Sequence, residues 1–81
     1  MTFAQAINKA NTIDISVHSP SHGLVRVPIS KNNARCVFGK IYVDTFTKDD
    51  SGGDLYCLTD WGETVWTFER WADGSTSLLI G

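Results

Sequence analysis

The spacing of hydrophobic and polar positions predicts a short helix at the start of the chain. Residues 2–10 place apolar side chains at intervals of three and four, as on one face of a helix: Phe3, Ala6, Ile7 and Ala10. Thr2 precedes this run and Gln5 follows three positions later, which is the spacing of a capping box. We therefore expect a helix over residues 2–10 that ends at Asn11.

From residue 12 onward the period changes to two, which is typical of strands with one buried side. Residues 12–18 alternate apolar and polar side chains, and residues 24–29 do so again after a turn of composition Ser-Pro-Ser-His-Gly. These two segments predict a β-hairpin. Pro28 has no N–H donor, so we expect the second strand to lie at an edge of the sheet.

A second short helix or turn is expected after the hairpin. Ser30 is a suitable N-cap, and Gly39 is a suitable left-handed stop. The buried side of such a helix would consist of Ala34, Val37 and Phe38. Consecutive asparagines at positions 32 and 33 are equally compatible with a loop, so both interpretations stay open.

The C-terminal half predicts an antiparallel meander of four strands. Its segments are separated by turn-forming residues and cover 41–47, 55–60, 63–71 and 76–80. Asp73-Gly74 is the strongest turn signal and predicts a two-residue type I′ turn. With that turn, Leu78 and Ile80 would share a sheet face with Trp71.

The predicted fold class is therefore α+β, with the short N-terminal helix packed on an antiparallel β-sheet of hairpin plus four-stranded meander. A half-open barrel is the alternative arrangement. All 81 residues, 1–81, are expected to form one compact domain. No stretch approaches the roughly 18 apolar residues that span a bilayer, and no secretion signal is evident. We expect a cytoplasmic protein, in the host cytoplasm if a phage encodes it, with no membrane partner.

Tryptophan placement is the most informative feature for function. Trp61, Trp66 and Trp71 fall within eleven residues. If residues 65–71 form one strand, Trp66 and Trp71 point to opposite faces, because strand side chains alternate. So short a chain has little material to cover both faces. Since Trp, Tyr and Arg are enriched at interface hot spots, we expect a partner-binding surface of Trp61, Trp71, Arg70, Glu69, Asp49, Asp50, Asp54 and Tyr56.

Charge and motifs argue against other function classes. Seven basic and nine acidic residues give a net charge of −2, whereas nucleic-acid binders carry a basic stripe. His18 and His22 lack a second ligand pair for zinc, and residues 49–54 fail the calcium-loop pattern and suit a turn. We expect no metal, no cofactor and no enzymatic activity. Cys36 and Cys57 are expected as reduced, buried thiols, with a disulfide as the alternative.

In size and general character, the chain resembles the stand-alone inhibitors of phages and mobile elements, including anti-CRISPR and other anti-defence proteins. That resemblance implies a protein-binding module that blocks a bacterial effector by steric occlusion, with aromatics and aspartates docked on a basic surface. A homodimer would also cover the aromatic surface. The first alternative is a single-stranded nucleic-acid-binding β-domain with bases stacked on the aromatics. The second is an oligomer that captures a small molecule such as a nucleotide.

Overall fold

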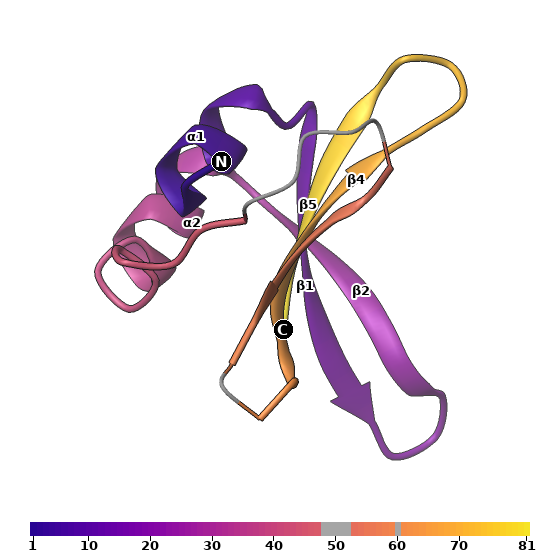
Figure 1. Ribbon diagram of the computed structural model, residues 1–81. Coiled ribbons are helices and arrows are strands. Elements are labelled where there is room, and N and C mark those ends of the chain that lie inside the picture. The colour runs from indigo at the N-terminus through magenta and orange to yellow at the C-terminus, as the bar shows by residue number, and fades with distance from the viewer. Residues whose placement is uncertain (48–52, 60) are drawn as a thin grey trace.

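A computed structural model describes residues 1–47, 53–59 and 61–81. Two helices lie together on one side of a single twisted sheet of five strands (Figure 1). In chain order the elements are α1 (Phe3–Lys9), β1 (Thr12–Ser19), β2 (Gly23–Ile29), α2 (Lys31–Phe38), β3 (Leu55–Leu58), β4 (Thr64–Arg70) and β5 (Thr76–Ile80). The α+β class and the N-terminal helix packed on a sheet are thus confirmed. No helix in these described ranges has the length and apolarity needed to cross a membrane.

The sheet is mixed, because its two antiparallel parts join through a parallel pair. Strand order is β2-β1-β5-β4-β3. β1 pairs antiparallel with β2 and parallel with β5, while β3, β4 and β5 form an antiparallel meander. The sheet does not close into a barrel: β2 and β3 are its edges. Pro28 therefore lies in an edge strand, as its missing N–H predicted.

Helix α1 begins where the capping pattern predicted. The Gln5 N–H donates to the Thr2 hydroxyl oxygen at 3.2 Å, and the Thr2 N–H donates to the Gln5 side-chain oxygen at 2.8 Å. A helix of seven residues is marginal in isolation. Its buried face against the sheet, formed by Phe3, Ala6 and Ile7, supplies the remaining stabilisation.

Helix α2 confirms the helical interpretation of residues 30–39, but not all of its expected core. The Ser30 hydroxyl accepts the N–H of Asn33 at 3.1 Å and caps the helix. Ala34 is fully buried, whereas Val37 is 56% exposed. The prediction for Val37 is wrong because α2 packs along one narrow side and leaves its other sides to solvent.

The segment after α2 forms turns, so the strand predicted over residues 41–47 is wrong. Backbone N–H groups of Tyr42 and Thr45 donate to carbonyls three or four residues earlier, which closes local turns. Phe46 forms an isolated antiparallel bridge with Thr2, the residue before α1, and is not part of a strand. Gly39 has φ −58°, not a left-handed value. Glycine is required there for space, since a Cβ would lie 2.4 Å from a carbonyl oxygen of α2.

The loop between β4 and β5 has three residues instead of the predicted two. The Trp71 N–H donates to the Ser75 carbonyl at 3.0 Å, and the Gly74 N–H donates to the Trp71 carbonyl at 3.0 Å. Gly74 has φ +88°, but no non-glycine residue among those described has positive φ. A type I′ turn needs positive φ at both central residues, so Asp73 excludes it.

The longer loop shifts the predicted β4–β5 register by one residue. Phe68 lies opposite Leu78, and Trp66 lies opposite Ile80. A shift of one residue moves a strand's side chains to the other face. Leu78 and Ile80 consequently join the buried face and do not accompany Trp71, which corrects the prediction.

Trp66 lies at the centre of the core between the helices and the sheet. Its side chain has no exposed surface, and its ring meets that of Phe3 edge-on at 5.6 Å between centroids. Its indole N–H donates to the Thr45 hydroxyl at 2.9 Å, so the buried donor is satisfied. The core consists of Phe3, Ala6, Ile7, Ala10, Ile13, Ala34, Leu55, Cys57, Trp66, Phe68, Leu78 and Ile80.

The two cysteines differ in environment. Both are free thiols, so the alternative of a disulfide is wrong. Cys57 is buried in β3, as expected. Cys36 is exposed on α2, against prediction.

Candidate functional site

The side of the sheet that faces away from α1 and α2 carries most of the candidate residues; we call it the open face (Figure 1). No helix covers it in the described ranges. Strand residues that alternate with the core positions point to this side. They are Asp14, Ser16, His18, Leu24, Arg26, Pro28, Tyr56, Val65, Thr67, Glu69, Ser77 and Leu79, with Trp71 directly after β4.

A polar network crosses four strands of the open face. The Arg26 guanidinium donates two bonds to the Glu69 carboxylate, one of them at 3.1 Å, and a third to Asp14 at 3.0 Å. The Ser77 hydroxyl donates to Glu69 at 2.7 Å, and the Trp71 indole N–H donates to the Ser77 hydroxyl oxygen at 3.0 Å. β2, β1, β4 and β5 are therefore tied to one another by side chains as well as by the backbone.

The network keeps its central charges ionised. Hydrogen bonds from Arg26 lower the pKa of Glu69 below its ordinary value, although partial burial opposes this shift. The hydrogen bond to Glu69 in turn raises the pKa of Arg26. The Arg26 side chain remains 39% exposed, and partly exposed ion pairs contribute only about 0.5–1 kcal/mol. The main effect of this pair is to orient the side chains around it.

Trp71 is the exposed aromatic end of this network. Its side chain lies on the opposite face from Trp66, as the alternation of side chains predicted, and it is 51% exposed. Ser77, which accepts the indole N–H, is buried. The indole is thus anchored at one edge while half of the residue remains available for contact.

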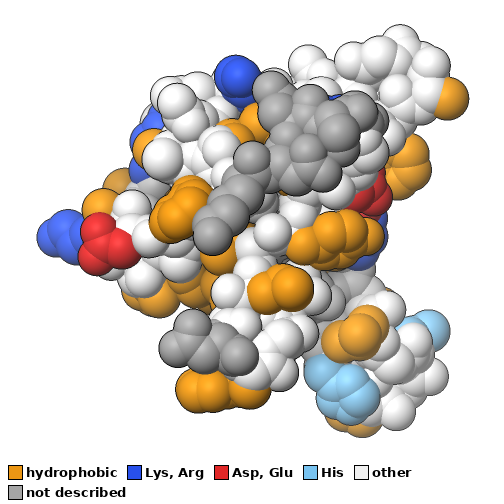
Figure 2. All heavy atoms as spheres, viewed as in Figure 1, with side chains coloured by type: hydrophobic (Ala, Val, Ile, Leu, Met, Phe, Trp, Pro, Cys, Tyr) orange, Lys and Arg blue, Asp and Glu red, His pale blue; other side chains and the backbone are white. Residues whose placement is uncertain are grey.

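Other large apolar side chains lie on the open face near its margins. Tyr56 on the edge strand β3 is 54% exposed, and Leu24 on the opposite edge strand β2 is 74% exposed. The space-filling view shows hydrophobic side chains at separate places over the sheet and beside the helices, not in one block (Figure 2). Polar side chains lie between these apolar positions, so the open face has a mixed composition.

Trp61 does not belong to the same surface as Trp71. It lies in the β3–β4 turn, is 81% exposed, and its indole N–H donates to Glu63 at 3.4 Å. The seven residues of β4 separate the two indoles, and at about 3.3 Å per residue that is a span of about 20 Å. For Trp61 and Trp71 to share one interface, as predicted, a partner would have to contact the full length of β4.

Arg70 points to the helix side of β4, not to the open face. Its guanidinium lies 5.9 Å from the centroid of the Phe68 ring, and its backbone N–H donates to Asp54 at 3.0 Å. One carboxylate oxygen of Asp54 therefore caps the strand pair, while the residue itself stays exposed. Asp49 and Asp50 lie outside the described residues.

Three members of the open-face site were not predicted from the sequence: Asp14, Arg26 and Ser77. The available signal was the alternation in residues 12–18 and 24–29, which places Asp14 and Arg26 on the same side of the hairpin. The contact with Glu69 depends on the parallel pairing of β1 with β5, which the local pattern does not show.

Charge on the open face disfavours nucleic acid. The network contains two carboxylates, Asp14 and Glu69, against the single guanidinium of Arg26, a formal charge of −1. Nucleic-acid affinity depends on concentrated positive charge. His18 and His22 lie near the tip of the β1–β2 hairpin, and the described residues contain no group of three or more potential metal ligands.

Comparison of the chain with protein-family models, with curated proteins and with solved structures found no match. A functional conclusion for this chain rests on the physical character of its surfaces.

Proposed function

We propose that this chain is a non-enzymatic protein-binding module whose open face covers a surface of another protein. The observation that carries the proposal is the anchored, half-exposed indole of Trp71. Its hydrogen bond to Ser77 holds the ring before any partner arrives, so binding costs less side-chain entropy. Tryptophan is also among the residues that contribute most at interface hot spots.

A contact of standard size would cover a modest share of the surface of this chain. Such an interface buries about 800 Å² on each partner. The whole chain has an accessible surface of 5358 Å², so about one seventh of it would be covered. Within it, Trp71 and Tyr56 would supply apolar contacts, and the Arg26–Glu69 pair would supply polar ones.

Electrostatic complementarity favours a partner with a neutral or basic surface. The network carries a formal charge of −1, and the whole chain carries −2. A chain of this size that occupied a basic surface of a bacterial effector would inhibit it by steric occlusion. Small inhibitors encoded by phages and mobile elements act in this way, and we assign the chain to that functional class within this proposal.

Affinity purification from bacterial lysate tests the proposal through variants of the open face. Trp71→Ala removes the anchored indole, and Tyr56→Ala removes a second ring whose side chain forms no hydrogen bond with the part of the chain that the structure describes. Val37→Ala is the matched control, because Val37 is 56% exposed on α2, away from the open face. Circular dichroism establishes that each variant is folded.

We expect wild type and Val37→Ala to retain the same specific protein, and Trp71→Ala to retain at least about tenfold less, which corresponds to about 1.4 kcal/mol. Tyr56→Ala should show a smaller loss in the same direction. Equal recovery by all four proteins would place the contact elsewhere and contradict the proposal. Loss with Val37→Ala alone would contradict it as well.

A further inference from the structure

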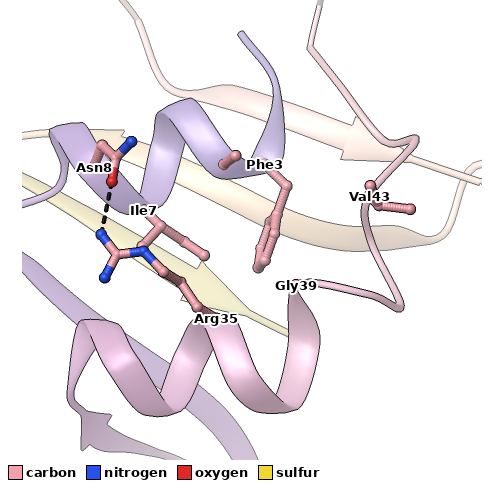
Figure 3. Close-up of a pocket in the computed structure, with 7 residues that line it drawn as sticks. Phe3, Ile7, Asn8, Arg35, Gly39 and Val43 are labelled. Carbon is pink, nitrogen blue, oxygen red and sulfur yellow. Dashed lines mark hydrogen bonds between the residues drawn. The ribbon is translucent and has the colours of Figure 1, made fainter.

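A small hollow lies on the helix side of the molecule, away from the open face. It is bounded by α1, α2 and the segment that follows α2 (Figure 3). Phe3 and Ile7, each 1% exposed, form an apolar floor, while Gly39 and Val43 lie opposite α1. Its volume is about 110 Å³, which is less than the roughly 150 Å³ of a cavity that accepts benzene. One aliphatic side chain fits a space of this size, whereas a nucleotide does not.

The charged group at this hollow is Arg35, whose side chain crosses from α2 toward α1 (Figure 3). It donates to the amide oxygen of Asn8 at 2.7 Å and to that of Asn32 at 3.3 Å. Both acceptors are neutral, and no carboxylate pairs with Arg35 within the described ranges. A guanidinium has five N–H donors, so donors remain for an anionic acceptor. Arg26, by contrast, already contacts two carboxylates.

Asn8 adds a donor at the same rim. Its side-chain oxygen accepts from Arg35, which leaves the two N–H donors of its amide nitrogen for another acceptor. Lys31 donates to the backbone carbonyl of Asn8 at 3.0 Å and brings a second positive charge. Lys40 and Asp44, which follow Gly39 and Val43, cancel each other in formal charge. The rim therefore has a positive excess beside an apolar floor.

We propose that this hollow binds the C-terminal residue of a partner polypeptide when that residue is Leu, Ile or Val. Arg35 lines the hollow beside Phe3 and Ile7. A ligand that uses both parts of the site therefore needs an apolar group and an anionic group only a few ångströms apart. A C-terminal residue carries both on one Cα. Its side chain would occupy the space over Phe3 and Ile7, and its carboxylate would accept from Arg35 and Asn8. Charge-assisted bonds from arginine to a carboxylate are stronger than those to neutral amides.

This binding site is separate from the one proposed on the open face. The experiment is a nuclear magnetic resonance titration of the isotopically labelled full chain with three peptides. Acetyl-Gly-Gly-Leu has a free C-terminal carboxylate, and the same peptide with a C-terminal amide lacks it. A third peptide, acetyl-Gly-Leu-Asp-Gly-amide, places the carboxylate on an internal side chain.

We expect saturable shifts of backbone amides in α1 and α2 with the free carboxylate, and binding at least about tenfold weaker with the amide. Arg35→Gln should abolish the difference between these two peptides, whereas Lys9→Gln, which removes one positive charge from α1 outside the hollow, should preserve it. Ala4 also lines the hollow, so Ala4→Leu fills it without a change of charge and should weaken binding as well. Trp71→Ala should bind normally, so the two proposals fail independently.

Equal affinity for acid and amide, preference for the internal aspartate, or no shift with any peptide would each overturn the assignment. Should Arg35→Gln fail to fold, Ala4→Leu decides the matter: unchanged affinity in that variant would contradict a side chain bound in the hollow.

Discussion

At the scale of single residues, Arg26 has the largest influence on the open face. It contacts Asp14 twelve positions away and Glu69 forty-three positions away. Alternation along the hairpin makes the first contact predictable in outline. The second depends on which strands are neighbours, and no property of the residues at 26 and 69 specifies that. Residue patterns thus predicted the polar face of the hairpin, but not the network that fixes Trp71.

Glu69→Gln should reveal the network through the pH dependence of stability. The folded pKa of Glu69 is lowered from its ordinary 4.5 by Arg26. A carboxyl with a depressed folded pKa stabilises the fold above its unfolded pKa, and this contribution is lost as pH falls through the folded value. Urea unfolding at a series of pH values measures it. We expect wild type to exceed Glu69→Gln by about 1 kcal/mol at pH 7, and the gap to shrink below about pH 4.5.

The matched control is Glu63→Gln in the β3–β4 turn, whose carboxylate receives only the long 3.4 Å bond from Trp61 among the described residues. Its stability difference from wild type at pH 7 should be small. A gap for Glu69→Gln that stays the same from pH 7 to pH 3 would show that Arg26 does not stabilise the ionised form.

At the scale of elements, caps and periodicity predicted the structure well wherever both were present. α1 and α2 have Thr2 and Ser30 at their N-caps, and β5 occupies the predicted residues. Residues 41–47 alternate apolar and polar side chains, yet they form turns in which the N–H groups of Tyr42 and Thr45 donate to local carbonyls. Periodicity alone does not show whether a neighbouring strand is available to pair.

Gly74 is the element-scale position with the clearest conformational requirement. Its φ of +88° lies in the left-handed region, where a Cβ is sterically strained. Gly74→Ala should lower the free energy of unfolding by about 1–2 kcal/mol. Gly53→Ala is the control, since Gly53 has no positive φ and a Cβ added there would meet no atom within 4 Å. Chemical denaturation of both variants gives the comparison, and equal stability would argue against the three-residue loop.

At the scale of the whole molecule, the parallel pairing of β1 with β5 determines which surfaces exist. It joins the N-terminal hairpin to the C-terminal meander, and Asn11 and Thr76 exchange hydrogen bonds beside it. This pairing joins residues about 65 positions apart, and such distant contacts leave little trace in local sequence patterns. The α+β class was predictable, whereas the mixed sheet and the composition of the open face were not.

The small size of the molecule also explains why aromatic side chains stay exposed. Two short helices can cover one side of a five-stranded sheet only in part, and the core uses one tryptophan, Trp66. Trp71 and Trp61 lie outside it at the two ends of β4. The proposed docking role therefore depends on an isolated chain that leaves the Trp71 indole open to solvent.

The most direct test is fluorine nuclear magnetic resonance of the dilute chain with 5-fluorotryptophan at all three positions, with a soluble paramagnetic agent added. Single Trp→Phe variants assign the resonances. We predict strong broadening for Trp61, intermediate broadening for Trp71 and almost none for Trp66, in line with their exposed fractions of 81%, 51% and 0%. Equal protection of all three indoles would contradict the existence of an uncovered aromatic surface on this protein.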